Sequence, residues 1–323
     1  MDIFKKLQKK SATRLKTIIL PESYDVRVIR AVKEIMKKNI AKIILIQTKG
    51  DLGKLIKPHK NLTHIGINRS KDFLHEFHSL RKKTKPDNDL QQSGNLLNDP
   101  LTFSCMLLKK DFADGIIAGS VYSTSEVLKN GISLIGLSEN NKTVSSFFLF
   151  TFPKDHKFKK TIIAYADCGV IPTPTADQLC DIALETSANF KKLTGLIPKV
   201  AFLSFSTKGS AKDDSLEKIL RAYELTKKRD PKLICDAELQ FDAAFVPEVS
   251  QIKNPGGKIK GDANVFIFPD LNSGNIAYKI TERIGGAVAT GPIIQGLAKP
   301  VMDLSRGCSA NDIVNMAKVI INL

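Results

Sequence analysis

Short runs of β-branched and aliphatic residues alternate with longer amphipathic stretches along this chain. Residues 25–38, 176–193, 210–228 and 275–284 repeat apolar side chains every three or four positions, as a helix that buries one face does. The runs expected as strands are residues 16–20, 42–46, 114–118, 161–166, 199–203 and 264–268. This alternation predicts an α/β architecture.

Four of the expected strands run directly into polar loops. These loops are residues 119–124, 167–175, 204–210 and 269–275. Ligands of open α/β sheets bind beyond the carboxyl ends of the strands. The loops are therefore the predicted ligand-binding region.

Length and composition favour a soluble globular protein. With 323 residues, of which 42% are hydrophobic, two domains are expected. No apolar run is long enough to cross a bilayer, and residues 1–10 lack the apolar core of a signal peptide. The five cysteines are widely spread and contain no Cys-x-x-Cys pair, so we expect neither a disulfide framework nor a zinc site. A reducing cytoplasm is the expected compartment.

The net charge of +16 raises the question of a nucleic-acid partner. The lysines occur as short scattered pairs, such as residues 82–83 and 159–160, and they form no RNA- or DNA-binding signature. Solvated faces explain most of them. We expect no nucleic-acid partner, and the charge favours attraction of small anionic substrates instead.

The histidines limit the possible catalytic chemistry. All five lie in the first half of the chain, away from the polar loops, so a Ser-His-Asp triad is not expected. Proton transfer in the C-terminal half then requires a carboxylate. The chain also lacks a Gly-x-Gly-x-x-Gly turn after its first strand and a Gly-x-x-x-x-Gly-Lys-Ser/Thr loop, which argues against dinucleotide binding and nucleotide triphosphatase chemistry.

Residues 299–312 bring the strongest chemical signal. Ser305, Arg306 and Asp312 lie within eight residues, beside the expected start of a helix, where an anion is stabilised. The pattern predicts an anion site with a possible base beside it. The run from Ser309 to Asp312 also has the pattern of a capping box, and the pattern alone favours this interpretation of Asp312. One residue can serve both purposes.

Five blocks, residues 206–212, 236–244, 268–279, 291–296 and 303–307, resemble the signature blocks of the phosphate acetyltransferase family. The resemblance runs in order from about residue 20 to the C-terminus. It implies reversible transfer of an acetyl group between acetyl-coenzyme A and inorganic phosphate, which gives coenzyme A and acetyl phosphate.

The resemblance also implies a fold. Family members have two α/β domains related to those of the isocitrate and isopropylmalate dehydrogenases, with the active site in the interdomain cleft, and are usually homodimers. Residues 1–150 together with 296–323 would form the first domain, and residues 151–295 the second. The resemblance implies no metal and no redox cofactor, because coenzyme A is a substrate.

The family's catalytic serine, arginine and aspartate fall on Ser305, Arg306 and Asp312. Arg306 can contact two oxygens of a phosphate or acyl phosphate. Ser305 could donate a hydrogen bond to the developing oxyanion. Asp312 would take the proton of the coenzyme A thiol, so that the thiolate attacks acetyl phosphate directly in a ternary complex.

The resemblance places further residues near the substrates. They are Arg81, Ser123, Thr124, Lys129, Ser206, Lys208, Asn272 and Gly274. Arg81 matches an arginine used toward coenzyme A. Lys129 stands where the family usually has an arginine, and a lysine cannot make a bidentate contact. Met302 replaces an asparagine that usually precedes Asp303. Turn and helix capping is the alternative role of the hydroxyl and amide residues.

Three alternatives remain open at this point. A phosphate butyryltransferase would need a larger acyl pocket. A dehydrogenase of the shared fold would need a metal-binding aspartate cluster and a nucleotide loop, which the sequence lacks. A non-enzymatic basic protein would show salt-sensitive binding to nucleic acid.

Overall fold

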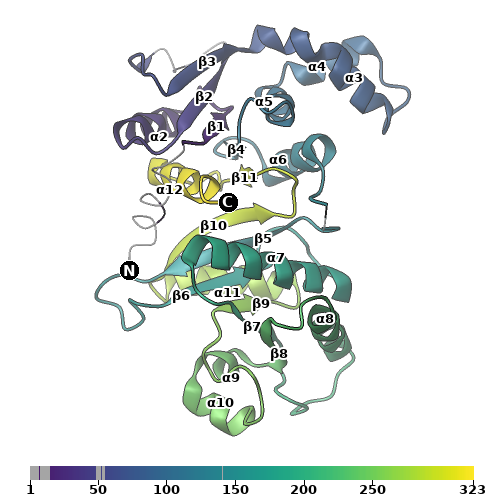
Figure 1. Cartoon of the computed structure of the whole chain (residues 1–323), viewed down its shortest axis with the longest axis vertical. Coiled ribbons are helices and arrows are strands. Elements are labelled where there is room, and N and C mark those ends of the chain that lie inside the picture. Colours follow the sequence, from purple (N-terminus) through teal and green to yellow (C-terminus); the bar gives the residue numbers. More distant parts are fainter. Residues whose placement is uncertain (1–6, 8–14, 49–51, 53–54, 140) are drawn as a thin grey trace. The chain divides into compact units, whose positions relative to one another are not determined.

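The computed structural model describes residues 7, 15–48, 52, 55–139 and 141–323 (Figure 1). These residues divide into two compact units. The first unit comprises the described residues up to Glu139 together with Leu297–Leu323, and the second comprises those of Asn140–Gly296.

The first unit is built on a parallel sheet. Within the described residues, five strands pair in the order β11-β4-β1-β2-β3. Their bounds are Thr17–Leu20 for β1, Lys42–Gln47 for β2, Leu62–Gly66 for β3, Gly115–Ala118 for β4 and Val301–Asp303 for β11. The last strand of the chain therefore lies beside β4, and Asp303 is the register partner of Ala118.

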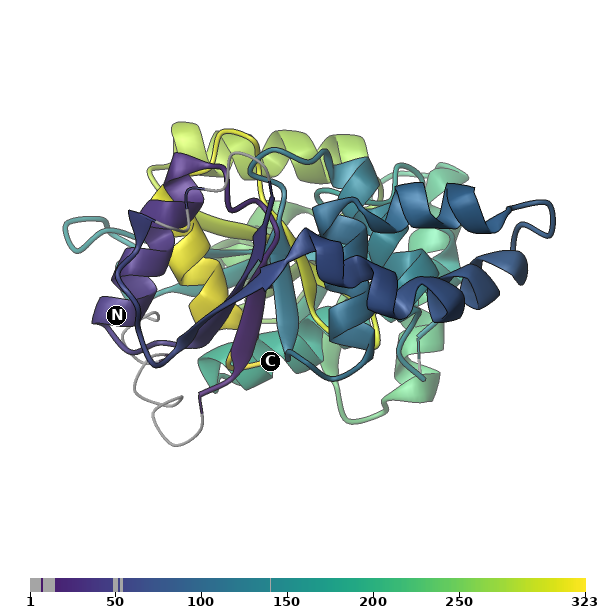
Figure 2. The same cartoon turned by 90° about the horizontal axis from the view of Figure 1, so that it is seen from above.

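Helices cover both faces of this sheet, as Figure 2 shows. Their bounds are Val26–Lys37 for α2, Ile67–Phe73 for η3, Leu74–Lys82 for α3, Leu90–Leu97 for α4, Pro100–Lys109 for α5, Thr124–Asn130 for α6, Gly131–Ile135 for η4 and Ala310–Ile320 for α12. Helices α2 and α12 pack side by side on one face, and α5 packs on the other. Helix α2 forms because its buried side chains recur at helical spacing and Asp25 caps its first turn.

The second unit holds a mixed sheet. In its described part, six strands pair in the order β10-β5-β6-β9-β7-β8. Their bounds are Ser145–Thr151 for β5, Ile162–Ala166 for β6, Lys199–Leu203 for β7, Ile234–Leu239 for β8, Val265–Ile267 for β9 and Val288–Gln295 for β10. Strand β5 runs antiparallel to both β10 and β6, and the other pairs are parallel. Residue 150, where the sequence-based division places the domain boundary, lies inside β5.

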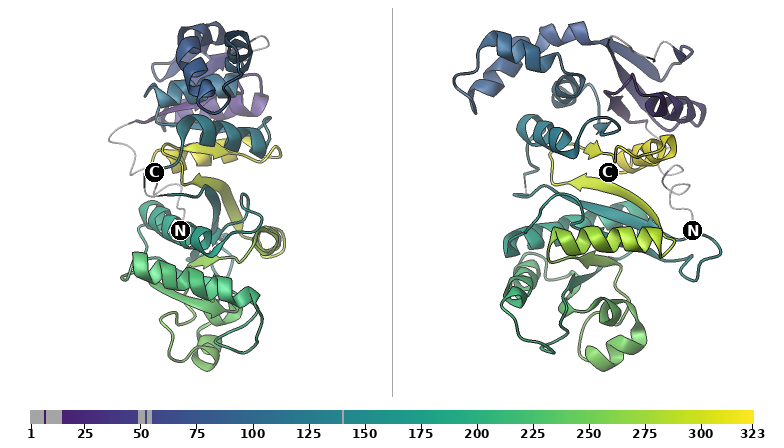
Figure 3. Two further views of the ribbon diagram at one scale, coloured as in Figure 1. Left: turned by 90° about the vertical axis from the view of Figure 1, so that its right-hand side faces the viewer. Right: turned by 180° about the vertical axis from the view of Figure 1, so that it is seen from behind.

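Helices also lie on both faces of the second sheet. Their bounds are Ala176–Thr194 for α7, Ser215–Arg229 for α8, Phe241–Phe245 for α9, Pro247–Lys253 for α10 and Leu271–Arg283 for α11. Helices α7 and α8 pack together, and Figure 3 shows α11 on the opposite face. The core beneath α11 includes Phe148, which stacks on Tyr278 at a ring-centroid distance of 4.3 Å.

The predicted α/β architecture is confirmed. Each of the six predicted strands overlaps an observed one, and each of the four predicted helices overlaps an observed helix. Strands β3, β8, β10 and β11 were not predicted. In the described part of the chain, no helix has the length and apolar character needed to span a membrane.

Candidate functional site

The loop between β11 and α12 carries Ser305 and Arg306, and Asp312 lies in the first turn of α12. The buried strand ends at Asp303, and Ser309 caps the helix that begins at Ala310. Asp312 Oδ2 accepts hydrogen bonds from Ser309 N and Ser309 Oγ, both at 2.8 Å. Ser309 Oγ in turn accepts from Asp312 N at 3.3 Å. The predicted capping box is therefore present, and it holds the Asp312 carboxylate at the first turn of α12.

Ser305 and Arg306 are exposed in this loop. Ser305 Oγ accepts a hydrogen bond from Gly307 N at 3.2 Å, which leaves the hydroxyl hydrogen free to donate. Within the described residues, the Arg306 guanidinium makes no hydrogen bond or ion pair, and only its carbonyl oxygen is bonded. The loop therefore offers an unpaired cation and a hydroxyl donor to an anionic ligand.

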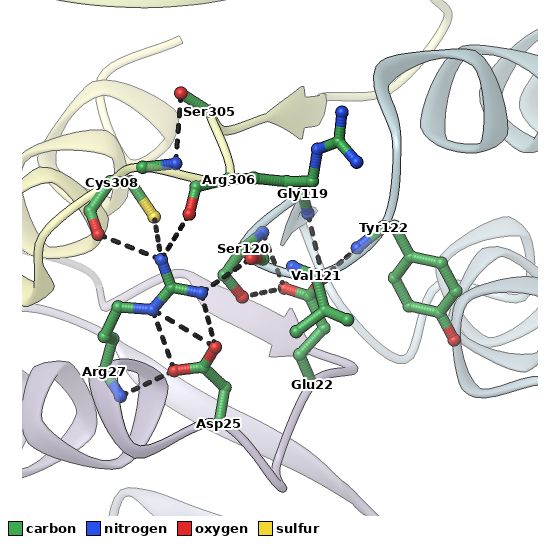
Figure 4. Close-up of polar contacts among 11 residues, drawn as sticks. Glu22, Asp25, Arg27, Gly119, Ser120, Val121, Tyr122, Ser305, Arg306 and Cys308 are labelled. Carbon is green, nitrogen blue, oxygen red and sulfur yellow. Dashed lines mark hydrogen bonds and ion pairs between the residues drawn. The ribbon is translucent and has the colours of Figure 1, made fainter.

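Arg27 of α2 binds the backbone of this loop (Figure 4). Its Nη1 donates to Arg306 O at 2.6 Å and to Cys308 O at 3.2 Å. Its Nη2 donates to Ser120 O at 2.6 Å, and to the Asp25 carboxylate, also at 2.6 Å. The hydrogen bond from Arg27 lowers the pKa of Asp25, as expected for an ion pair. One guanidinium thus links the start of α2, the β4 loop and the β11 loop.

Glu22 organises the loop that follows β4 (Figure 4). Its side chain is buried at 1% exposure and accepts from the backbone nitrogens of Gly119, Ser120, Val121 and Tyr122 at 2.8–3.2 Å. The Ser120 hydroxyl donates to the same carboxylate. A buried carboxylate that accepts this many hydrogen bonds fixes the course of the loop toward α6.

Ser123 and Thr124 begin helix α6. Ser123 caps the helix and shares a capping box with Glu126, whose Oε2 accepts from Ser123 N and Oγ at 2.8 and 2.7 Å. Thr124 Oγ1 donates to Asp303 Oδ2 at 2.6 Å. This bond ties the start of α6 to the end of β11, so the β4 and β11 loops are held together. Both predicted substrate residues therefore already have protein partners.

Asp303 is a buried acid beneath these loops, with 1% exposure. Its Oδ1 is buried and has no hydrogen-bond partner among the described residues. Burial is the main cause that raises the pKa of Asp303 to about 6, and the negative charge of Glu22 adds to the rise, while the Thr124 hydrogen bond opposes it.

Arg81 and Lys129 are brought together at a cavity of about 280 Å³ formed by α3, α4, α5, α6 and η4. Lys85, which sequence reasoning missed, also lines it, and Glu126 is the one acid among the lining residues described. Arg81 Nε is buried without a hydrogen-bond partner in the described structure. An excess of positive charge around a cavity suits a phosphate-bearing ligand.

Ser206 and Lys208 lie in the second unit, in the loop after β7. Ser206 is fully buried and its Oγ donates to Glu238 Oε1 at 2.7 Å, the same oxygen that accepts from Gly209 N at 2.7 Å. Lys208 Nζ donates to Ala237 O at 3.1 Å. The donors that the sequence analysis assigned to a substrate thus contact the end of β8. Glu238 was not recognised from the sequence.

Asn272 and Gly274 lie in the first turn of α11, which Asp270 caps by accepting from Ser273 N at 2.8 Å. Asn272 is exposed. A β-carbon on Gly274 would collide with the carbonyl oxygen of Asp167. The helix therefore requires glycine there to approach the loop after β6, so this position serves close packing in the structure.

The described residues contain no group of three or more histidine, cysteine, aspartate or glutamate side chains suited to a metal ion. Each of the five cysteines is a buried free thiol. Burial raises the pKa of Cys308, which lies in the β11 loop, to about 11. This thiol therefore stays protonated near neutral pH.

Residues 2–321 match the model of the phosphate acetyl/butaryl transferase family. The chain belongs to this family. A phosphate acetyltransferase of Acetivibrio thermocellus is 43% identical over 324 residues, which cover 99% of this chain and 97% of that protein.

Solved structures agree with membership of the transferase family. A phosphotransacetylase from Streptococcus pyogenes superimposes with a TM-score of 0.91 at 36% identity, covering 99% of this chain and 97% of that one. A 4-hydroxythreonine-4-phosphate dehydrogenase from Klebsiella pneumoniae, at 9% identity, has a TM-score of 0.55 and covers 96% of this chain and 100% of its own. That similarity shows the fold alone, and it confirms the predicted relationship to dehydrogenase-like folds.

In this family member the predicted site residues form three groups. The β11 loop and the starts of α12 and α6, all in the first unit, hold Ser305, Arg306, Asp312, Ser123 and Thr124, and Thr124 donates to the buried Asp303. Arg81 and Lys129 line the cavity of the first unit. Ser206, Lys208, Asn272 and Gly274 belong to the second unit.

Arg27 and Glu22 were missed from the sequence. The position of Glu22, just after the first strand, was a usable signal. A carboxylate at the end of a buried strand needs several hydrogen-bond donors. Apart from Asp25, their partners lie 93 to 281 residues further along the chain, and local patterns do not reveal such contacts.

Proposed function

We propose that this protein is a phosphate acetyltransferase, which transfers an acetyl group between acetyl-coenzyme A and inorganic phosphate. The observation that carries the proposal is the unpaired Arg306 guanidinium, held in one loop with the Ser305 hydroxyl, next to the helix turn that carries the Asp312 carboxylate. Full-length relatives named phosphate acetyltransferase support the same reaction.

Arg306 would bind the phosphoryl group. Its planar guanidinium can donate to two oxygens of acetyl phosphate. Ser305 would donate its free hydroxyl hydrogen to the carbonyl oxygen as negative charge develops there. The hydrogen bond from Gly307 N orients this hydroxyl, because it occupies one lone pair of the oxygen.

Asp312 would act as the general base. The capping contacts to Ser309 all use Oδ2, and no described residue donates to Oδ1. Oδ1 is therefore available for the thiol proton of coenzyme A while Oδ2 keeps the side chain in place. The sulfur then attacks the acetyl carbon, the bond from that carbon to the phosphate oxygen breaks, and inorganic phosphate leaves.

Coenzyme A carries phosphate groups that the cavity of the first unit could bind. Arg81, Lys85 and Lys129 supply positive charge around its 280 Å³ volume. The substrate contacts of Ser123, Thr124, Ser206, Lys208, Asn272 and Gly274 remain predictions from the family resemblance. Thr124 and Ser206 already donate to carboxylates, so a substrate would meet their oxygen lone pairs or displace those bonds.

A homodimer, a cytoplasmic location and independence of metal and redox cofactors complete the proposal. The resemblance supports the dimer, and light scattering of the purified protein would measure its mass directly. Five buried free thiols favour a reducing compartment. Cofactor independence predicts full activity after dialysis against a chelator, and a loss that added metal restores would contradict it.

The reaction is tested by following thioester formation from coenzyme A with acetyl phosphate and, in parallel, with butyryl phosphate. We expect rapid acetyl transfer and slower butyryl transfer. Faster butyryl transfer would make the protein a butyryltransferase. No transfer from either donor would refute the proposed function.

A further inference from the structure

Every N–H group of the Arg27 guanidinium is used within the first unit. Nε donates to Asp25 Oδ1 at 3.0 Å and to Oδ2 at 3.2 Å. The two hydrogens of Nη1 serve the carbonyls of Arg306 and Cys308, and those of Nη2 serve Asp25 and the carbonyl of Ser120. A guanidinium has five N–H donors, and all are engaged here. Arg27 is therefore not available to bind a substrate anion.

The two carbonyls in the β11 loop belong to Arg306 and Cys308, with one residue between them, and each is part of a rigid peptide plane. In a trans peptide the N–H of the next residue points opposite to the carbonyl. When Arg27 holds Arg306 O, it directs Gly307 N away from itself, and this nitrogen donates to Ser305 Oγ at 3.2 Å. The guanidinium thus acts on the Ser305 hydroxyl through one peptide plane.

The peptide plane between Cys308 and Ser309 connects Arg27 to the Asp312 carboxylate in the same way. When Arg27 holds Cys308 O, it directs Ser309 N away from itself, and this nitrogen donates to Asp312 Oδ2 at 2.8 Å. Both backbone nitrogens that orient the proposed catalytic side chains therefore belong to peptide groups whose carbonyls bind one cation. Figure 4 shows the Arg27 end of this arrangement.

We propose that Arg27 is a positioning residue, which sets the Ser305 hydroxyl and the Asp312 carboxylate through the backbone of the β11 loop. The inference rests on the proposed acetyl transfer, since it gives Ser305 and Asp312 their roles. With its donors engaged by the protein, Arg27 would act without contacting the substrate or the reacting atoms. Its effect is on the geometry of the loop, where a shift of about 1 Å can cost on the order of 100-fold in rate.

A lysine cannot reproduce this arrangement. Its ammonium group has three donors around one nitrogen, whereas the acceptors are spread over three loops and need a planar fork. Arg27→Lys therefore keeps the charge beside Asp25 and loses part of the contacts to the carbonyls. Asp25→Asn does the reverse, because it removes the charge of the partner and leaves Arg27 its three carbonyl acceptors. Asparagine is also a good helix cap.

The experiment compares Arg27→Lys, Arg27→Met and Asp25→Asn with Arg30→Gln, which changes an exposed arginine one turn along the same helix. We expect kcat to fall about 10-fold in Arg27→Lys and about 100-fold in Arg27→Met, with little change in KM for coenzyme A. Arg30→Gln should stay within about threefold of the wild type, and Asp25→Asn should lose less than Arg27→Met because the three carbonyl acceptors of Arg27 remain. All assays are run below the melting temperature of the least stable variant.

A second measurement follows the order of the β11 loop independently of acetyl transfer. Hydrogen–deuterium exchange of the peptide spanning residues 303–312 should speed up in both Arg27 variants and not in Arg30→Gln. Unchanged exchange in this peptide, or a wild-type kcat in Arg27→Met, would overturn the proposal. If the wild-type protein transfers no acetyl group, the proposed function fails, and the exchange comparison still decides whether Arg27 orders the loop.

Discussion

Asp312 Oδ2 and Ser309 Oγ lie 2.8 Å apart in a capping box at the start of α12. From the sequence alone, helix capping and proton transfer were competing interpretations of this acid. The structure assigns the capping bonds to one carboxylate oxygen and leaves the other without a donor among the described residues. The two roles can therefore coexist in one side chain.

Replacing Asp312 with asparagine tests its role as a base. An amide keeps an oxygen acceptor for the Ser309 bonds but cannot take a proton, so we expect kcat to fall at least about 100-fold. The melting temperature should change by only a few degrees, because a capping contact contributes about 1 kcal/mol. Turnover and thermal unfolding of the same preparation provide the comparison.

Gln178→Ala is the matched control, since Gln178 holds the same position in the capping box of α7. It should lower the melting temperature slightly and leave kcat unchanged. If Asp312→Asn behaved like Gln178→Ala, the carboxylate would be a cap only.

Lys129 marks a departure from the arginine that is usual in the family. Because an arginine can contact two phosphate oxygens at once, Lys129→Arg should lower KM for coenzyme A, by about three- to tenfold, with little effect on kcat. Lys154→Arg, at an exposed position of the second unit, is the control and should change neither constant. An unchanged or higher KM for Lys129→Arg would show that Lys129 does not contact coenzyme A.

Asp303 makes stability depend on pH. Its pKa is raised from 3.8 to about 6 in the folded protein, so the folded state binds this proton more tightly than the unfolded state does. The contribution of Asp303 to the free energy of unfolding is fully present below about pH 4. It is lost as the pH rises through about 6. Well above that pH, the buried charge costs about 3 kcal/mol relative to the acid form.

Asp303→Asn removes this titration. The variant should be more stable than the wild type at pH 7.5, and the difference should shrink as the pH falls toward 4. Urea unfolding of both proteins at several pH values measures it. A difference that stays constant between pH 4 and 7.5 would contradict titration of Asp303 in this range.

The core of the fold was predictable because its signals are local. Strands β1, β2, β4 and β6 are runs of buried aliphatic residues, which the pattern finds directly. Strand β8 was missed because Asp236 and Glu238 interrupt its apolar pattern. Both acids are buried and accept hydrogen bonds from residues distant in sequence, Asp236 from Ile259 N and Glu238 from Ser206 Oγ. Strand β10 was missed because its bulge between Thr290 and Ile293 contains Gly291 and Pro292, which are typical of turns.

The candidate site divides in the same way. Ser305, Arg306 and Asp312 are close in sequence, so their proximity could be predicted without a structure. The hydrogen bond from Arg27 to Arg306 O in that loop joins residues 279 positions apart. It forms because β11 pairs with β4 in the sheet. Nothing in the sequence around Arg27 reveals this, since its partners are backbone carbonyls and carry no residue signature.

The central claim is that Arg306 binds the phosphoryl group during acetyl transfer. The most direct measurement is the rate of acetyl-coenzyme A formation from acetyl phosphate by the wild-type protein, Arg306→Gln and the exposed-arginine control Arg30→Gln. We expect turnover within about 1–10³ s⁻¹ for the wild type and the control. Arg306→Gln should be at least about 100-fold slower at an unchanged melting temperature. Equal rates in all three proteins, or no thioester from the wild type, would contradict the claim.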